Sequence, residues 1–137
     1  MAACGTAATA WRTSHHHARL QRASCGAAIT HSLTGHTRIL SADPGSLACF
    51  IRAARECRPA SIAITEMGVD SGTDYVFVIT PAKPPCQVTE QRQDYSANFG
   101  GSHGAVSTVP CRRVAVTPGG VTLSCRGQTI LLPARVS

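Results

Sequence analysis

The chain has 137 residues, 15% of them charged, with a formal net charge of +6 and seven cysteines. This length accommodates a single domain, and the longest apolar runs, of four or five residues, are far too short to cross a membrane. The positive charge favours anionic partners, but nucleic-acid binding is not expected, because only six residues are aromatic and the arginines are spread along the chain.

The composition changes near Asp43-Pro44 and divides the chain into two parts. Residues 1–42 consist mainly of Ala, Thr, Ser and His, whereas residues 43–137 hold most of the bulky apolar side chains. The first part has too little apolar surface to offset the entropy of ordering it, and it contains no convincing signal peptide. We expect residues 1–42 to be an N-terminal extension, which is a disordered tail, a targeting-like segment or a wrongly assigned start.

Three consecutive histidines, at residues 15–17, lie within this extension. Adjacent side chains of an extended chain point to opposite sides, so such a triplet gives a metal ion no fixed geometry. We expect no metal site there, and no motif in the chain indicates a cofactor.

The folded part is predicted to begin with an amphipathic helix that starts at Asp43-Pro44 and ends before Pro59. Its apolar side chains recur at the spacing of one helical face, and they are Leu47, Phe50, Ile51 and Ala54. Cys57 flanks this strip and Cys49 lies nearly opposite to it. The strip therefore predicts a helix that packs on a sheet.

Strands are predicted after the helix, at residues 61–67, 74–80, 86–90, 111–125 (a hairpin) and 129–132. Both faces of segment 74–80 are apolar, which indicates a central strand whose outer face is covered by another layer, by a partner or by the N-terminal segment. Together these elements predict an α+β fold, with one N-terminal helix packed on a four- or five-stranded antiparallel sheet. Residues 43–137 then form one small domain.

Residues 91–110 are the longest segment without a clear period, and long loops in small domains are often functional. Tyr95, Asn98, Phe99 and His103 stand there among glycines and serines, a mixture of rigid rings and adaptable polar groups that is typical of binding sites. We interpret this segment as a surface that binds a protein or a glycan. The alternative is a mobile connection with Tyr95 or Phe99 packed on the sheet.

Catalysis is the second hypothesis for the same segment. A small hydrolase would use His103 together with a cysteine or an acidic partner, but no local signature supports such a pair. A non-catalytic binding domain is the preferred interpretation.

The cysteine content indicates an oxidising compartment, so we expect a secreted or cell-envelope protein whose domain is stabilised by disulfides. The candidates for bridges are Cys57, Cys86, Cys111 and Cys125, which allow three connectivities. Cys49 is left over, and it pairs with Cys25, Cys4 or another chain, or remains free.

The hairpin at residues 111–125 suggests which of these connectivities forms. A two-residue turn at Pro118-Gly119 pairs Val116 with Val121 and Val114 with Leu123, which gives one apolar face. Cys111 and Cys125 then point to opposite faces, unless Gly119-Gly120 forms a bulge. We expect Cys125 to bridge to Cys57 or Cys86, and Cys111 to bridge elsewhere.

Overall fold

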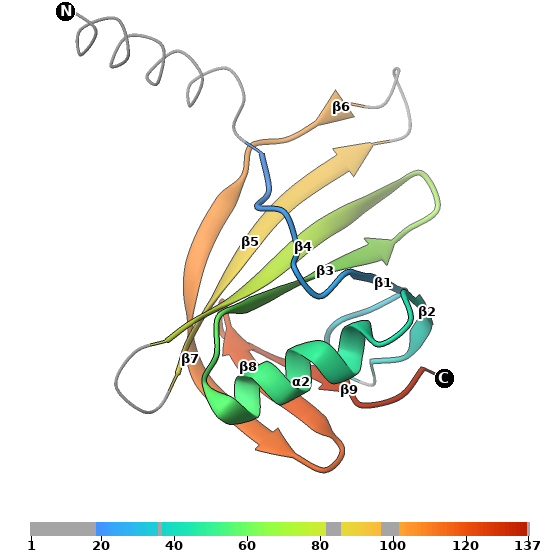
Figure 1. Ribbon diagram of the computed structural model, residues 1–137. Coiled ribbons are helices and arrows are strands. Elements are labelled where there is room, and N and C mark those ends of the chain that lie inside the picture. The colour runs from blue at the N-terminus through green and yellow to red at the C-terminus, as the bar shows by residue number, and fades with distance from the viewer. Residues whose placement is uncertain (1–18, 36, 82–85, 97–101, 137) are drawn as a thin grey trace, which may run out of the picture.

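A computed structural model describes residues 19–35, 37–81, 86–96 and 102–136 (Figure 1). These described residues fold into one curled sheet of nine strands and one helix. In chain order the elements are β1 (Ala27–Thr30), β2 (Ile39–Ala42), α2 (Ser46–Glu56), β3 (Ala60–Met67), β4 (Ser71–Thr80), β5 (Gln87–Ser96), β6 (Ser102–His103), β7 (Ser107–Thr117), β8 (Gly120–Cys125) and β9 (Gln128–Pro133). The predicted α+β domain with a four- or five-stranded antiparallel sheet is therefore wrong.

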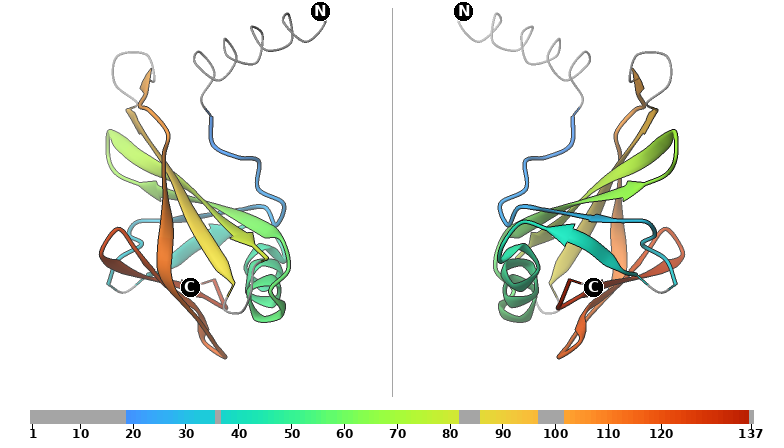
Figure 2. Two further views of the ribbon diagram at one scale, coloured as in Figure 1. Left: turned by 90° about the vertical axis from the view of Figure 1, so that its left-hand side faces the viewer. Right: turned by 90° about the vertical axis from the view of Figure 1, so that its right-hand side faces the viewer.

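The sheet is mixed and much larger than expected. Its strand order is β2-β1-β3-β4-β5-β7-β8-β9, with β6 paired to β5, and β1 runs parallel to β3 while the other pairs are antiparallel. The long strand β7 pairs with β5 through its first half and with β8 through its second half. The sheet curls there, and a bridge between Thr34 and Ile130 brings β9 to the β1–β2 end (Figure 2).

Helix α2 has the buried strip that the sequence predicts, since Leu47, Phe50, Ile51 and Ala54 are all buried. Asp43 was expected to cap the helix, but its Oδ2 instead accepts a hydrogen bond from the Ala27 backbone N–H at 2.9 Å. The helix packs against β3, β1, β7 and β8, so it closes one end of the curl. Among the described residues, no helix has the length and apolar character needed to cross a membrane.

Residues 19–42, which we expected to be part of an extension, contribute to this sheet. Three of their apolar residues are almost fully buried in the same core as Phe77: Ala28 in β1, Leu33 between β1 and β2, and Ile39 in β2. These few apolar side chains stabilise the segment because they enter a core built by the rest of the chain. Residues 1–18 lie outside the described residues, so their role as a tail or targeting segment stays a prediction.

Residues 19–24 cross the outer face of the sheet (blue in Figure 1). The Ser24 N–H donates to Ser61 Oγ at 2.8 Å, and the Gln21 N–H donates to Gln91 Oε1 at 2.7 Å. Val76, on the outer face of β4, is consequently only 2% exposed. The sequence left open whether another layer, a partner or the N-terminal segment covers the apolar outer face of segment 74–80. The structure shows that the N-terminal segment does.

Residues 91–110 are mostly strand, in contrast to the loop that we expected. Residues 91–96 continue β5, and residues 107–110 begin β7 and pair with β5. The polar side chains of this stretch hid its strand character, because they lie on a face where an apolar pattern was expected. Residues 97–101 lie outside the described residues.

Three disulfides join Cys25 to Cys49, Cys57 to Cys86 and Cys111 to Cys125. Our expectation that Cys125 bridges to Cys57 or Cys86 is wrong. The predicted hairpin register is correct, with Val116 opposite Val121 and Val114 opposite Leu123, but a register shift between Cys111 and Arg113 brings Cys111 opposite Cys125. The bulge lies at Arg112, and not at Gly119-Gly120 as the expected alternative required.

Candidate functional site

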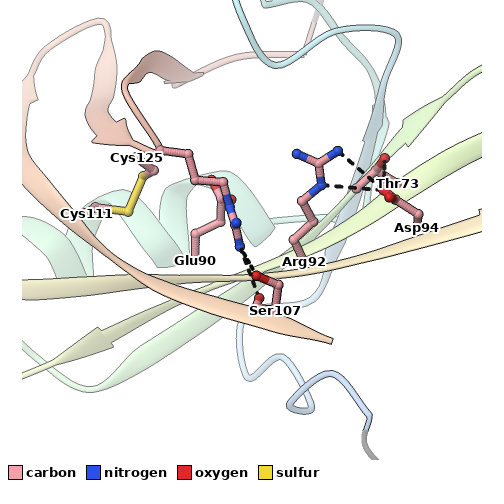
Figure 3. A network of polar contacts seen from close by, with 8 residues as sticks. Thr73, Glu90, Arg92, Asp94, Ser107, Cys111 and Cys125 are labelled. Carbon is pink, nitrogen blue, oxygen red and sulfur yellow. Dashed lines mark hydrogen bonds and ion pairs between the residues drawn. A yellow bond between two sulfur atoms is a disulfide. The ribbon is translucent and has the colours of Figure 1, made fainter. Parts of the chain in front are cut away.

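The inward face of β4 and β5 changes from apolar to polar along the strands. Successive cross-strand pairs on this face are Ile79 with Val88, Phe77 with Glu90, Tyr75 with Arg92 and Thr73 with Asp94. The apolar pairs lie near α2, where the core is. The polar pairs lie toward the opposite, open end of the curl, and they form the candidate site (Figure 3).

Glu90 is the deepest charged group of the site, with only 1% of its surface exposed. A buried carboxylate is costly unless it is paired, and Arg126 pairs with it through Nε. Arg126 Nη2 also donates to Ser107 Oγ at 2.9 Å and to the Ser107 carbonyl at 3.2 Å. Arg126 lies in the turn between β8 and β9 with a left-handed φ of 54°. Its guanidinium therefore ties that turn to β5 and β7.

Arg92 and Asp94 form a second, more open pair. Nε and Nη2 of Arg92 each lie 3.4 Å from Asp94 Oδ1, which also accepts a hydrogen bond from Thr73 Oγ1 at 2.8 Å. The two side chains are 39% and 65% exposed, so water screens this ion pair and it adds little stability. The guanidinium also lies 5.8 Å from the centroid of the Tyr75 ring, at cation–π distance. Both groups remain accessible to a ligand.

Tyr75 connects the polar network to the core, since its ring stacks on Phe77 with centroids 5.9 Å apart. Burial raises the pKa of Tyr75 above 10.0, and the carboxylates of Glu66, Glu90 and Asp94 raise it further, against the opposing effect of Arg92. Burial lowers the pKa of Arg92, but the charges of Tyr75 and Asp94 outweigh this and leave it raised. The site therefore holds a neutral phenol beside a permanent cation.

We expect Tyr75 to titrate above its ordinary value. Because its pKa is raised in the folded state, the stability that the neutral phenol contributes is complete below about pH 10 and is lost as the pH rises through the folded-state pKa. Ultraviolet titration of tyrosinate formation in the native protein should show this delayed component. The Tyr75→Phe variant should lack it, and a delayed component that persists in the variant would contradict the assignment.

A pocket of about 380 Å³ opens at this end of the sheet. Its polar lining consists of His31, Glu66, Ser71, Thr73, Asp94 and Tyr95. Glu66 is held in place because its Oε2 accepts a hydrogen bond from the Leu33 N–H at 2.9 Å. The volume lies within the range of pockets that bind small molecules, and its polar groups converge from β3, β4 and β5.

Tyr95 also lines this pocket. Gly72 lies opposite Tyr95 on β4, and a side chain at Gly72 would collide with the Tyr95 hydroxyl and ring. The absence of a side chain at Gly72 thus lets the ring lie across the strand. Tyr95 also pairs with His103 of β6, and their rings are 6.3 Å apart.

The structure places two of the four predicted binding residues together, Tyr95 and His103, while Asn98 and Phe99 lie outside the described residues. Sequence reasoning missed the rest of the site. Glu90, Arg92 and Asp94 recur at every second position, which is the signal of three charged side chains on one face of a strand. This signal was available, but segment 91–110 was interpreted as a loop.

The hydrolase hypothesis pairs His103 with a cysteine or an acid. His103 is exposed, and all six cysteines among the described residues are in disulfides. Within the described ranges, no three His, Cys, Asp or Glu side chains are grouped as metal ligands would be. The triplet at residues 15–17 lies outside those ranges.

The curled mixed sheet, its three bridges and the polar pocket define a small, disulfide-stabilised domain of the class made in oxidising compartments. No protein-family model matches the chain, and neither a curated protein nor a solved structure matches it. Function must therefore be inferred from the chemistry of the site.

Proposed function

We propose that the protein is a non-catalytic binding domain that works outside the cytoplasm and holds a neutral oligosaccharide at the open end of its sheet. The observation that carries the proposal is the polar pocket at the end of an otherwise apolar inner face. Glu66 on β3 and Asp94 on β5 reach it from either side of β4, which carries Thr73 between them. Buried or half-buried polar groups that stability alone does not require are typical of binding sites.

The chemistry of the lining favours a ligand rich in hydroxyl groups. Carboxylate oxygens accept hydrogen bonds from hydroxyls, and only one oxygen of Asp94 is engaged by Thr73 and Arg92. Tyr95 also lines the pocket, and an aromatic ring has an apolar face of the kind that packs on a sugar ring. Arg92 offsets the charge of Asp94 and leaves that of Glu66, so a neutral ligand is favoured over an anionic one.

The bridges support this function by keeping the site rigid. Cys25–Cys49 and Cys57–Cys86 fix the two ends of α2 to the rest of the fold. A preformed site loses less conformational entropy when the ligand binds. Three disulfides also suit the oxidising surroundings in which extracellular glycans occur.

The test is binding to an array of neutral oligosaccharides, followed by NMR titration with the strongest binder. Asp94→Ala should weaken binding by about tenfold or more, which corresponds to about 1.4 kcal/mol, because it removes a charged acceptor and releases Arg92. Asp70→Ala is the matched control, since Asp70 is an exposed acid in the adjacent β3–β4 turn and does not line the pocket.

Thermal unfolding of both variants must be measured alongside binding. Equal losses of affinity in the two variants, or shifts that map away from Thr73 and Tyr95, would contradict the proposed site. If the protein captures a protein partner through the same residues and binds no oligosaccharide, the proposed ligand class is wrong and the proposed location of the site is right.

A further inference from the structure

Two neighbouring arginines, Arg112 and Arg113, lie at the bulge in β7. Adjacent side chains of a regular strand point to opposite faces, but a bulge inserts an extra residue and re-aims its neighbours. Here Cys111 pairs with Cys125 and Arg113 pairs with Ser124, so Arg112 is the extra residue. Both Arg112 and Arg113 are exposed, and both line one hollow of about 600 Å³.

Two disulfides hold the walls of this hollow. Cys86 and Cys111 both line it, and each is bridged, to Cys57 and Cys125 respectively. The Cys111–Cys125 bridge joins Cys111, the residue before the bulge, to β8, so it fixes the strand register at the bulge. The hollow is therefore a built feature of the fold.

The charge of the hollow is unopposed. Of the described residues, none that lines the hollow is acidic, and neither Arg112 nor Arg113 takes part in an ion pair. Glu66 and Asp94 line the other pocket, at the opposite end of β5, and Glu90 is neutralised by Arg126. The positive potential here is thus available to an anion from solution.

We propose that Arg112 and Arg113 form a second binding site, for the sulfate ester groups of an anionic polysaccharide. A guanidinium presents planar N–H donors that match a tetrahedral oxyanion, and the Gln87 side chain at the wall of the hollow adds an amide donor. The lining, as far as the structure describes it, contains no aromatic ring on which a base would stack, so a polysaccharide is favoured over nucleic acid. The site is separate from the pocket of the proposed function, and neither depends on the other.

The test is isothermal titration calorimetry at physiological ionic strength, with a fully sulfated disaccharide as the probe. The double variant Arg112→Ala/Arg113→Ala should bind about tenfold more weakly or worse. The control is Arg52→Ala/Arg55→Ala, which removes the same charge from exposed positions on α2, and it should stay within about twofold. Equal losses in the two double variants would show diffuse attraction and overturn the site.

Two further measurements separate geometry from charge and identify the source of the anion. Arg112→Lys/Arg113→Lys keeps the charge but loses the planar donors, so it should still bind several-fold more weakly than the native protein. Unchanged affinity in this variant would overturn the proposal that the planar N–H donors of Arg112 and Arg113 bind the sulfate group. Inorganic sulfate should bind more weakly than the sulfated disaccharide, and tighter binding of free sulfate or of a single-stranded oligonucleotide would overturn the assignment to a polysaccharide.

Discussion

Replacing Arg126 by alanine should lower the free energy of unfolding by about 3–5 kcal/mol, because it leaves the Glu90 carboxylate buried without a cation. Glu90 is almost fully enclosed beside Phe77, and Arg126 is its ion-pair partner among the described residues. The substitution also removes the two hydrogen bonds to Ser107 that tie the β8–β9 turn to β7. Denaturant unfolding followed by circular dichroism measures the loss.

Arg135→Ala is the matched control, since Arg135 is exposed and its replacement should change stability by no more than about 0.5 kcal/mol. The double variant Glu90→Leu/Arg126→Met should recover most of the lost stability, because an apolar pair of similar volume has no charge to desolvate. A single Arg126→Ala variant as stable as the control would mean that water reaches Glu90 in solution.

The helix and the hairpin register were predictable because each follows from a local pattern. The strip from Leu47 to Ala54 has helical spacing, and Val114 and Val116 alternate around a short turn. In contrast, the pairing of Cys111 with Cys125 depends on one extra residue at Arg112, which no apolar pattern reveals. A correct register therefore led to a wrong disulfide.

The extent and curl of the sheet were not predictable, because they depend on contacts between distant segments. β1 has four residues, of which Ile29 alone is bulky and apolar, and it is held as a strand by its pairing with β2 and with β3, where Ala28 lies opposite Ile64. Pro110 lies in β7 where the strand changes its partner from β5 to β8. Proline suits such a position, because it cannot donate to a continuous ladder.

The site was only half predictable for a related reason. The alternation of Glu90, Arg92 and Asp94 is a local signal, and it indicates one charged face of a strand. The partner of Glu90 lies 36 residues away in a turn, and nothing near Arg126 marks it as an internal cation. Local periodicity thus identifies the charged face of β5, whereas the ion-pair partners of its residues become known only from the folded structure.

Removing the Cys57–Cys86 bridge should have the second large effect on stability. The free energy of unfolding should fall by about 2–4 kcal/mol, because the unfolded chain gains conformational entropy without the crosslink, and it should fall further because packing in the core is lost. Cys86 is only 9% exposed, and its sulfur lies 3.7 Å from the Ala54 carbonyl oxygen at the end of α2. Replacing both cysteines by alanine therefore removes a packed group as well as a crosslink, and each buried heavy atom lost adds to the cost. Guanidinium unfolding without reductant measures the sum.

The Cys25–Cys49 bridge provides the comparison, because its sequence separation of 24 is close to the 29 of Cys57–Cys86. The chain-entropy contributions of the two bridges should then be nearly equal. Cys49 is exposed on the side of α2 away from the buried strip, so its alanine variant leaves no cavity in the core. Cys25→Ala/Cys49→Ala should consequently be the more stable double variant. Equal losses would mean that both bridges act through the unfolded chain alone, and that Cys86 contributes nothing to packing under α2.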